Sequence, residues 1–102
     1  GAFDAINVGP NAVALLGKNL HDSQFQRIIK VKPKSVFVFL DNDAKLQSVK
    51  VANLLSNFIN TVRLVSPIKN KDAGSMSKKE IAHSLANSYS LTSINVLKFL
   101  HE

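Results

Sequence analysis

Three short apolar runs, separated by longer segments with helical periodicity, constrain the fold of this 102-residue chain more than any other feature. The runs are Ala12–Leu16, Val36–Leu40 and Thr61–Val65, the last interrupted only by Arg63. Short apolar runs rich in β-branched or aromatic residues indicate strands buried on both faces, which is typical of a parallel sheet. The three runs are therefore expected to form the interior of a sheet covered by helices.

The segments between and after these runs predict four helices, since apolar residues recur there at the i, i+3, i+4 spacing. In the third helix the opening S-K-K-E lets Ser77 cap the first turn while Glu80 reaches back to it. Gly9–Asn11 predicts a turn. Strands and helices in alternation predict an α/β fold, as one domain over residues 1–102, with functional sites at the carboxyl ends of the strands. The helical segments are Asp22–Val31, Lys45–Phe58, Ser77–Ser88 and a last one through Ile94, Leu97 and Leu100.

The composition narrows the classes of function. The formal net charge is +6, from 13 basic and 7 acidic residues, which favours a polyanionic partner such as nucleic acid. The chain has no cysteine, which excludes disulfides, thiolate zinc sites and a cysteine nucleophile. It opens without the basic and apolar regions of a signal peptide, and its longest apolar run is far too short to span a bilayer. We therefore expect a soluble, cytoplasmic protein with no membrane partner.

Two carboxylates, Asp41 and Asp43, directly follow the central apolar run. In an extended backbone, residues two apart point to the same side, so both carboxylates are expected to face one way. Two carboxylates so close repel each other unless a cation lies between them, and oxygen ligands suit Mg²⁺ or Mn²⁺. Such a pair is suited to phosphoryl transfer. The alternative is that the pair only ends the strand and caps the helix that begins near Lys45, and the spacing alone leaves both interpretations open.

The order of short motifs along the chain resembles the Toprim family, and its DNA primase branch in particular. That family pairs a Glu, in the motif E-G-x-x-D, with a later D-x-D motif. The opening G-A-F-D is similar to the first motif: Gly1 and Asp4 match, and the Glu would be the residue before Gly1. The D-x-D motif follows as Asp41-Asn42-Asp43.

Two further stretches carry the resemblance, which covers residues 1–80. One is similar to the primase pattern G-T-x-L-T-x-x-Q, and the other to the pattern G-x-D-P-D near the end of the domain. The matching positions, including the one after the D-x-D motif, are Gly17, Leu20, Gln24, Ala44 and Asp72. The departures are Lys18 and His21 for the two threonines, Lys45 for a glycine, and Ala73 and Gly74 for the proline and the second acid.

The resemblance implies a Rossmann-like three-layer sandwich with a mainly parallel sheet, whose first strand would precede this chain. It implies that Asp41 and Asp43 are catalytic and hold Mg²⁺ or Mn²⁺, with Asp4 and Asp72 flanking the ion. The implied activity is nucleotidyl transfer by a DNA primase of a bacterial cell or a phage-infected host, which joins ribonucleotides into an RNA primer on a single-stranded DNA template. A replicative helicase is then a candidate partner. Since the motif Glu lies outside the chain, we expect the isolated chain to be inactive.

Nine of the 13 basic residues fall into two groups. Those that follow strand ends are candidates to contact nucleotide or nucleic-acid phosphates near the acidic residues; they are Lys18, Lys45, Lys69 and Lys71. The others are interpreted as solvated helix faces; they are Lys30, Lys32, Lys34, Lys78 and Lys79. The three histidines are dispersed, without the spacing of metal ligands.

Three alternatives stay open. Another Toprim enzyme, such as a nuclease of the overcoming-lysogenization type, a ribosomal-RNA maturase or a topoisomerase, would share the metal site and differ in substrate. A Toprim-derived module that has lost catalysis would bind only nucleic acid or a protein partner, which Gly74 and the missing Glu favour. A response-regulator-like domain would use Asp41 and Asp43 as an acidic pocket, with Lys69 or Lys71 as its lysine, but the opening G-A-F-D does not fit it.

Overall fold

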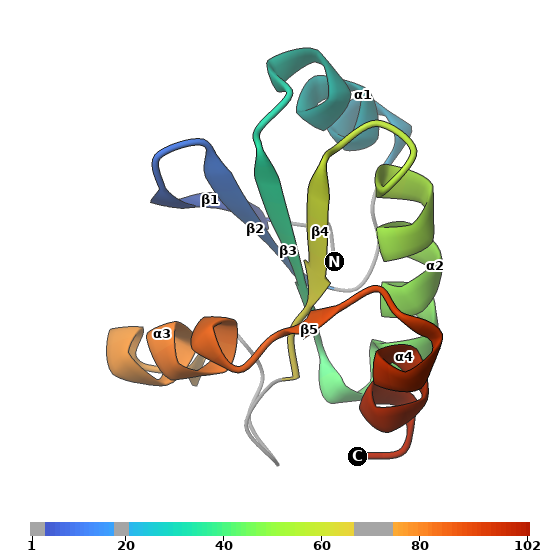
Figure 1. Cartoon of the computed structure of the whole chain (residues 1–102). Helices are drawn as coiled ribbons and strands as arrows, with labels where there is room; N and C mark the ends of the chain where they lie inside the picture. The colour runs from blue at the N-terminus through green and yellow to red at the C-terminus, as the bar shows by residue number, and fades with distance from the viewer. Residues whose placement is uncertain (1–3, 18–20, 67–74) are drawn as a thin grey trace.

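The computed structural model describes residues 4–17, 21–66 and 75–102, which form a five-stranded sheet with helices on both faces (Figure 1). This confirms the α/β class. The strands are β1 (Asp4–Gly9), β2 (Ala12–Gly17), β3 (Ser35–Leu40), β4 (Thr61–Leu64) and β5 (Tyr89–Ser90). The helices are α1 (Asp22–Val31), α2 (Lys45–Leu55), α3 (Lys78–Ala86) and α4 (Ser93–Leu100), with a short 3-10 helix, η1 (Asn42–Ala44), between β3 and α2.

The strands lie in the sheet in their order along the chain, β1-β2-β3-β4-β5. β2, β3 and β4, which correspond to the three predicted runs, are parallel neighbours. Both outer strands are antiparallel to their neighbours, so the sheet is mixed rather than mainly parallel. β1 reverses because the predicted turn at Gly9–Asn11 closes a hairpin, in which Asn11 has φ 60°, a left-handed conformation that Asn tolerates. β5 has only two residues, too few to show a pattern in the sequence.

The side chains of the central strand alternate between two hydrophobic clusters, as expected for a strand buried on both faces. Val36, Val38 and Leu40 of β3 belong to the larger cluster, to which α1, α2 and α4 contribute. Phe39 belongs to a smaller cluster, against which Ile81 of α3 packs. Figure 1 shows α2 and α4 on one side of the sheet and α3 on the other. Helices and sheet therefore form the expected three layers.

The helices lie where the sequence predicts them, with differences at their ends. α1 has the predicted bounds, whereas α2 and α3 end earlier than predicted. The predicted cap of α3 is present: Ser77 Oγ accepts a hydrogen bond from the N–H of Glu80 at 3.2 Å, and the N–H of Ser77 donates to Oε1 of Glu80 at 2.9 Å. Thr92 caps α4 through a 3.2 Å bond from the N–H of Asn95 to its hydroxyl.

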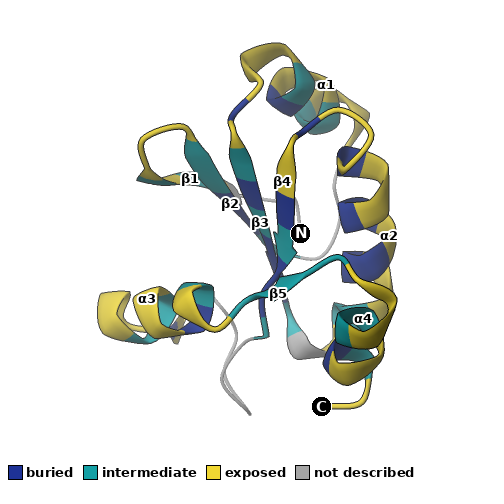
Figure 2. Ribbon diagram, viewed as in Figure 1, coloured by how far each residue is buried: buried dark blue, intermediate teal, exposed yellow. Residues whose placement is uncertain are grey.

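Burial is greatest in the central strands and on the side of α2 that faces them (Figure 2). Ala52 and Leu55 of α2 are fully buried, and they pack in the larger cluster with Phe99 of α4. The ring of Phe99 also makes an edge-to-face contact with Tyr89 of β5, at 6.3 Å between centroids. α4 is thereby anchored to both α2 and β5, the outer strand of the sheet. Within the described ranges, no helix is long and apolar enough to cross a membrane.

Candidate metal site at the carboxyl end of the sheet

The three parallel strands end at one edge of the sheet, where α/β folds place their functional sites. In the register of the sheet Gly17, the last residue of β2, pairs with Leu40, the last residue of β3. β4 stays in register with β3 up to its end at Leu64. The residues that directly follow these strands therefore lie at the same edge. Asp41 directly follows β3, and Ser66 lies two residues beyond the end of β4.

Asp41 is half-buried, and its backbone is held on both sides. Its N–H donates a hydrogen bond to the carbonyl oxygen of Gly17 at 3.3 Å, which extends the ladder between β2 and β3 by one step. Its own carbonyl oxygen accepts a hydrogen bond from the N–H of Ala44 at 2.9 Å, which closes the η1 turn. These two bonds fix the point from which the Asp41 carboxylate extends at the sheet edge.

Asp43 is exposed and lies inside η1. The prediction that Asp41 and Asp43 share one side because their backbone is extended is therefore wrong. β3 ends at Leu40, and the chain turns directly after it, because it must change direction to lay α2 against the sheet. The two carboxylates still leave the chain within one turn, at the carboxyl end of the central strand.

The interpretation of these residues as helix caps does not describe this turn either. Asp41 occupies the N-cap position of η1, and within the described part of the chain its side chain makes no capping bond there. The N-cap of α2 is Ala44, whose side chain has no hydrogen-bonding group. Neither of these two N-cap positions therefore has a side-chain capping bond.

Lys45, the first residue of α2, directs its ammonium to the end of α4. Its Nζ donates to the carbonyl oxygens of Phe99 and Glu102, each at 3.0 Å, and lies 5.4 Å from the centroid of the Phe99 ring. A cation at the C-terminus of a helix is stabilised by the carbonyl groups that have no partner within the helix. A phosphate contact by Lys45, as predicted from its position, would have to replace these bonds.

Glu102 lies at the same edge and was not singled out in the sequence, because no motif surrounds it. Its carboxylate accepts hydrogen bonds from the hydroxyl groups of Ser66 and Tyr89. The bond to Glu102 raises the pKa of the Tyr89 phenol above its usual value of 10.0, with smaller contributions from burial and from the negative charge of Glu102. Glu102 thus connects the end of β4 with β5.

The structure places Asp41 and Asp43 in the turn between β3 and α2, and Lys45 at the first position of α2. The side chain of Asp4, at the start of β1, and the predicted residues Lys18, Lys69, Lys71 and Asp72 lie outside the described part of the chain. Among the described residues, no three Asp, Glu or His side chains converge in a group that could hold a metal ion. Asp41 and Asp43 therefore supply two carboxylates, which suit a hydrated ion that keeps most of its waters, as Mg²⁺ does.

No protein-family model, curated protein or solved structure matches the chain. The structure itself defines the protein as an α/β domain with a partly parallel five-stranded sheet in its described residues. The resemblance to the primase branch of the Toprim family therefore depends on the sequence motifs and on where the D-x-D residues lie in the fold.

Proposed function

We propose that this chain is the metal-binding core of a Toprim-type nucleotidyl transferase, and that its parent protein is a DNA primase. The observation that carries the proposal is the position of the D-x-D motif. Asp41 and Asp43 directly follow β3, the central strand, which has a parallel neighbour on each side. That position is where α/β folds bind ligands, and the motif order along the chain resembles that of primases.

The chemistry of the turn supports a divalent cation there. Two carboxylates within three residues repel each other, and a cation between them offsets that repulsion. Mg²⁺ takes oxygen ligands at near-octahedral positions and usually keeps several waters, which phosphate oxygens of a nucleotide can replace. When bound, the ion would orient the phosphates and offset the charge that develops during nucleotidyl transfer.

The residues of the chain would position the ion and would form no covalent bond with the substrate. The hydrogen-bonded backbone of Asp41 fixes the point on the sheet from which one carboxylate extends. Asp43, which is exposed, reaches the same ion from the solvent side. Asp4 and Asp72, the remaining acidic residues of the motif order, are proposed to flank the ion, and the motif Glu that the resemblance implies is proposed to take part in proton transfer. Mn²⁺ is expected to substitute for Mg²⁺ because it accepts the same ligands.

Primer synthesis by the parent protein tests this function. A chain extended by the residues that precede Gly1 in its gene is assayed for RNA primers on a single-stranded DNA template, with ribonucleotides and Mg²⁺. We expect synthesis by the extended chain, no synthesis by residues 1–102 alone, and a loss of at least about 100-fold for Asp41→Asn, since removing one charge-stabilising group costs that much in other enzymes. Asp22→Asn, an exposed carboxylate of α1, is the matched control and should remain active.

A second candidate is a Toprim-derived module without catalysis. The absence of three converging ligands among the described residues favours it. Under that alternative the extended chain binds single-stranded DNA but makes no primers, and Asp41→Asn changes nothing. Cleavage of the template in place of primer synthesis, abolished by Asp41→Asn, would instead assign the site to a Toprim nuclease.

A further inference from the structure

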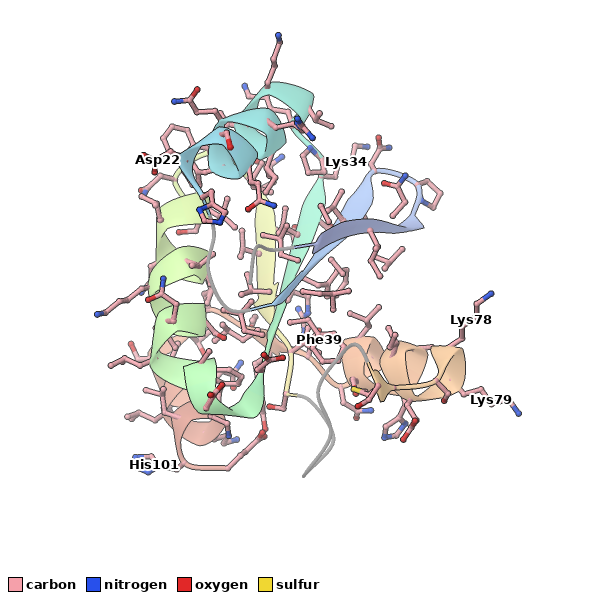
Figure 3. The ribbon with its side chains drawn as sticks, turned by 180° about the vertical axis from the view of Figure 1, so that it is seen from behind. Asp22, Lys34, Phe39, Lys78, Lys79 and His101 are labelled. Atoms are coloured by element: carbon pink, nitrogen blue, oxygen red, sulfur yellow. The ribbon has the colours of Figure 1, made fainter. Side chains whose placement is uncertain are left out.

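The end of the sheet opposite the D-x-D turn carries four cations, together with Asp22 at the start of α1 (Figure 3). Residues 23–40, which include most of α1 and all of β3, contain Arg27, Lys30, Lys32 and Lys34 and no Asp or Glu. Residues 44–71 also contain no acidic residue. Figure 3 shows Lys34 beside α1, at the end of the molecule far from His101. A surface on which cations outnumber carboxylates is complementary to a polyanion.

Two hollows meet at Pro33 on this end of the molecule. One, of about 190 Å³, is lined in part by Arg27 and Val31 of α1. The other, of about 140 Å³, is lined by Lys32, Lys34, Phe58, Asn60 and Pro33 itself. This surface lies at the amino ends of the parallel strands, and we call it the amino-end surface. It consists of Pro33 and of residues that line the two hollows beside it: Arg27, Val31, Lys32, Lys34, Phe58 and Asn60.

An aromatic ring is held on this surface. Phe58 is 49% exposed, and its ring makes an edge-to-face contact with Phe25 of α1, with 5.9 Å between centroids and 83° between planes. The contact orients the ring while leaving part of it open to solvent. An exposed, oriented aromatic ring beside lysines is the combination that binds unpaired bases together with their phosphates.

The backbone at Lys32 supports a role for this surface. Lys32 ends α1 in a left-handed conformation, with φ 49° and ψ 62°, and its N–H donates to the carbonyl oxygen of Ile28 at 2.9 Å. Gly and Asn are the usual residues at such a position because other side chains are strained there. Residues held in strained conformations concentrate at functional sites. The chain thus keeps a cation beside Phe58 at a position that does not favour lysine.

We propose that the amino-end surface binds single-stranded nucleic acid, with Lys32 and Lys34 contacting successive phosphates and Phe58 stacking on a base. A duplex would present the phosphates but no free base face to Phe58, so the single strand is the preferred form. The surface lies at the opposite end of the strands from Asp41 and Asp43, so binding there requires no divalent cation. The proposal goes beyond primer synthesis and does not depend on it.

Fluorescence anisotropy of a dye-labelled thymidine oligonucleotide of about 12 nucleotides, within the range that one small domain covers, tests the proposal. The titration is made in EDTA and compares two double variants of equal charge change, Lys32→Glu with Lys34→Glu, and Lys78→Glu with Lys79→Glu on α3. Figure 3 shows that the second pair lies on a different element, away from Lys34. We expect the first pair to weaken binding at least about tenfold and the second less than about twofold.

Two further measurements separate phosphate contact from stacking. The slope of log affinity against log salt should become shallower by about 0.7 for each lysine lost from the amino-end surface. Phe58→Leu, which keeps an apolar contact with Phe25, should weaken binding about fivefold or more, because base stacking on an aromatic side chain is lost. Leu46→Ala, at a 61% exposed position of α2, is the control and should bind as the unchanged chain does.

Thermal unfolding of each variant checks that the fold is retained. If the Lys32→Glu and Lys34→Glu double variant is unstable, Lys34→Glu alone replaces it in the titration, because Lys34 is exposed and lies outside the helices. Equal losses in both double variants would overturn the proposal, because they indicate general electrostatic attraction. Displacement by poly-glutamate at the same charge concentration, with no effect of Phe58→Leu, would assign the surface to an acidic protein. Loss of binding in Asp41→Asn with Asp43→Asn, measured in EDTA, would place the oligonucleotide at the other end of the sheet and also overturn it.

Discussion

The ammonium group of Lys45 lies 3.0 Å from the carbonyl oxygen of Phe99, so the residue that follows the D-x-D turn is bonded to the last helix. A second bond joins the same ammonium to the carbonyl oxygen of Glu102. Because Phe99 is buried in the larger cluster, these contacts connect the turn at the sheet edge to the core through α4. Where the primase pattern has a glycine, this chain has a lysine with a structural contact.

Replacing Lys45 should therefore destabilise the fold. Lys45→Met removes both hydrogen bonds and the cation over the Phe99 ring, and we expect it to lower the free energy of unfolding by about 1–2 kcal/mol, since bonds to charged groups contribute at that level. Urea denaturation measures the change. Lys50→Met, at an exposed position of the same helix, should change it by less than about 0.5 kcal/mol. Equal effects at the two positions would contradict the contact with α4.

The Tyr89 phenol should report its contact with Glu102 directly. Tyr89 is the single tyrosine and there is no tryptophan, so ultraviolet absorbance gives its titration without interference. The pKa of Tyr89 is raised above 10.0, first by the hydrogen bond to Glu102. Glu102→Gln should return the pKa toward 10.0, and Glu80→Gln should leave it unchanged. An unaltered Tyr89 titration in Glu102→Gln would show that the phenol does not bond to this carboxylate.

The same contact gives stability a dependence on alkaline pH. A pKa raised by folding means that the folded protein holds the phenol proton more tightly than the unfolded chain does. The contribution of Tyr89 is therefore complete below pH 10.0 and is lost as the pH rises through the higher pKa of the folded state. Denaturation at a series of pH values above 9 should show a steeper loss for the unchanged chain than for Tyr89→Phe. Parallel losses in the two proteins would argue against the linkage.

The cap of α3 should have a measurable energy. Ser77→Ala removes the hydroxyl that accepts the N–H of Glu80, and we expect a loss of about 1 kcal/mol in the free energy of unfolding. Ser23→Ala, at an exposed position inside α1, is the matched control because it truncates the same hydroxyl without removing a cap. A loss in Ser23→Ala as large as that in Ser77→Ala would contradict the capping box.

The smaller cluster should control the attachment of α3. Phe39 is fully buried on the face of β3 that α3 covers, so Phe39→Ala should cost about 3–5 kcal/mol. In the Phe39→Ala variant, hydrogen exchange should show that the amides of α3 lose protection before those of α2, because α2 packs in the other cluster. Simultaneous loss of protection in both helices would indicate that the two faces unfold as one unit.

Much of the fold could be predicted from the sequence because its signals are local. The apolar runs identified β2, β3 and β4. Side chains pack against both faces of β3, and every residue of this strand after Ser35 is apolar. The S-K-K-E pattern identified the start of α3 because a cap needs only four consecutive residues. The parallel order of the centre followed from the helices between the strands.

The remaining features depend on contacts between distant residues. Lys45 meets the carbonyl oxygen of Glu102, which is 57 positions away in the chain, and no spacing rule relates the two. The 3-10 turn at Asp43 follows from how α2 is laid against the sheet, so the extended backbone expected there was wrong. The two edge strands were not predicted as antiparallel members of the sheet. A turn reverses the chain between β1 and β2, and β5 is too short to leave a pattern in the sequence.

A Mn²⁺ titration of the isotope-labelled chain, followed by NMR, tests the proposed metal site most directly. Paramagnetic Mn²⁺ broadens signals close to the bound ion, so we expect the amides of Asp41, Asp43 and Gly17 to disappear first. Asp41→Asn should abolish this selectivity, while Asp22→Asn should preserve it. Uniform broadening at all exposed carboxylates, unchanged by Asp41→Asn, would contradict the assignment of this sheet edge as a metal site.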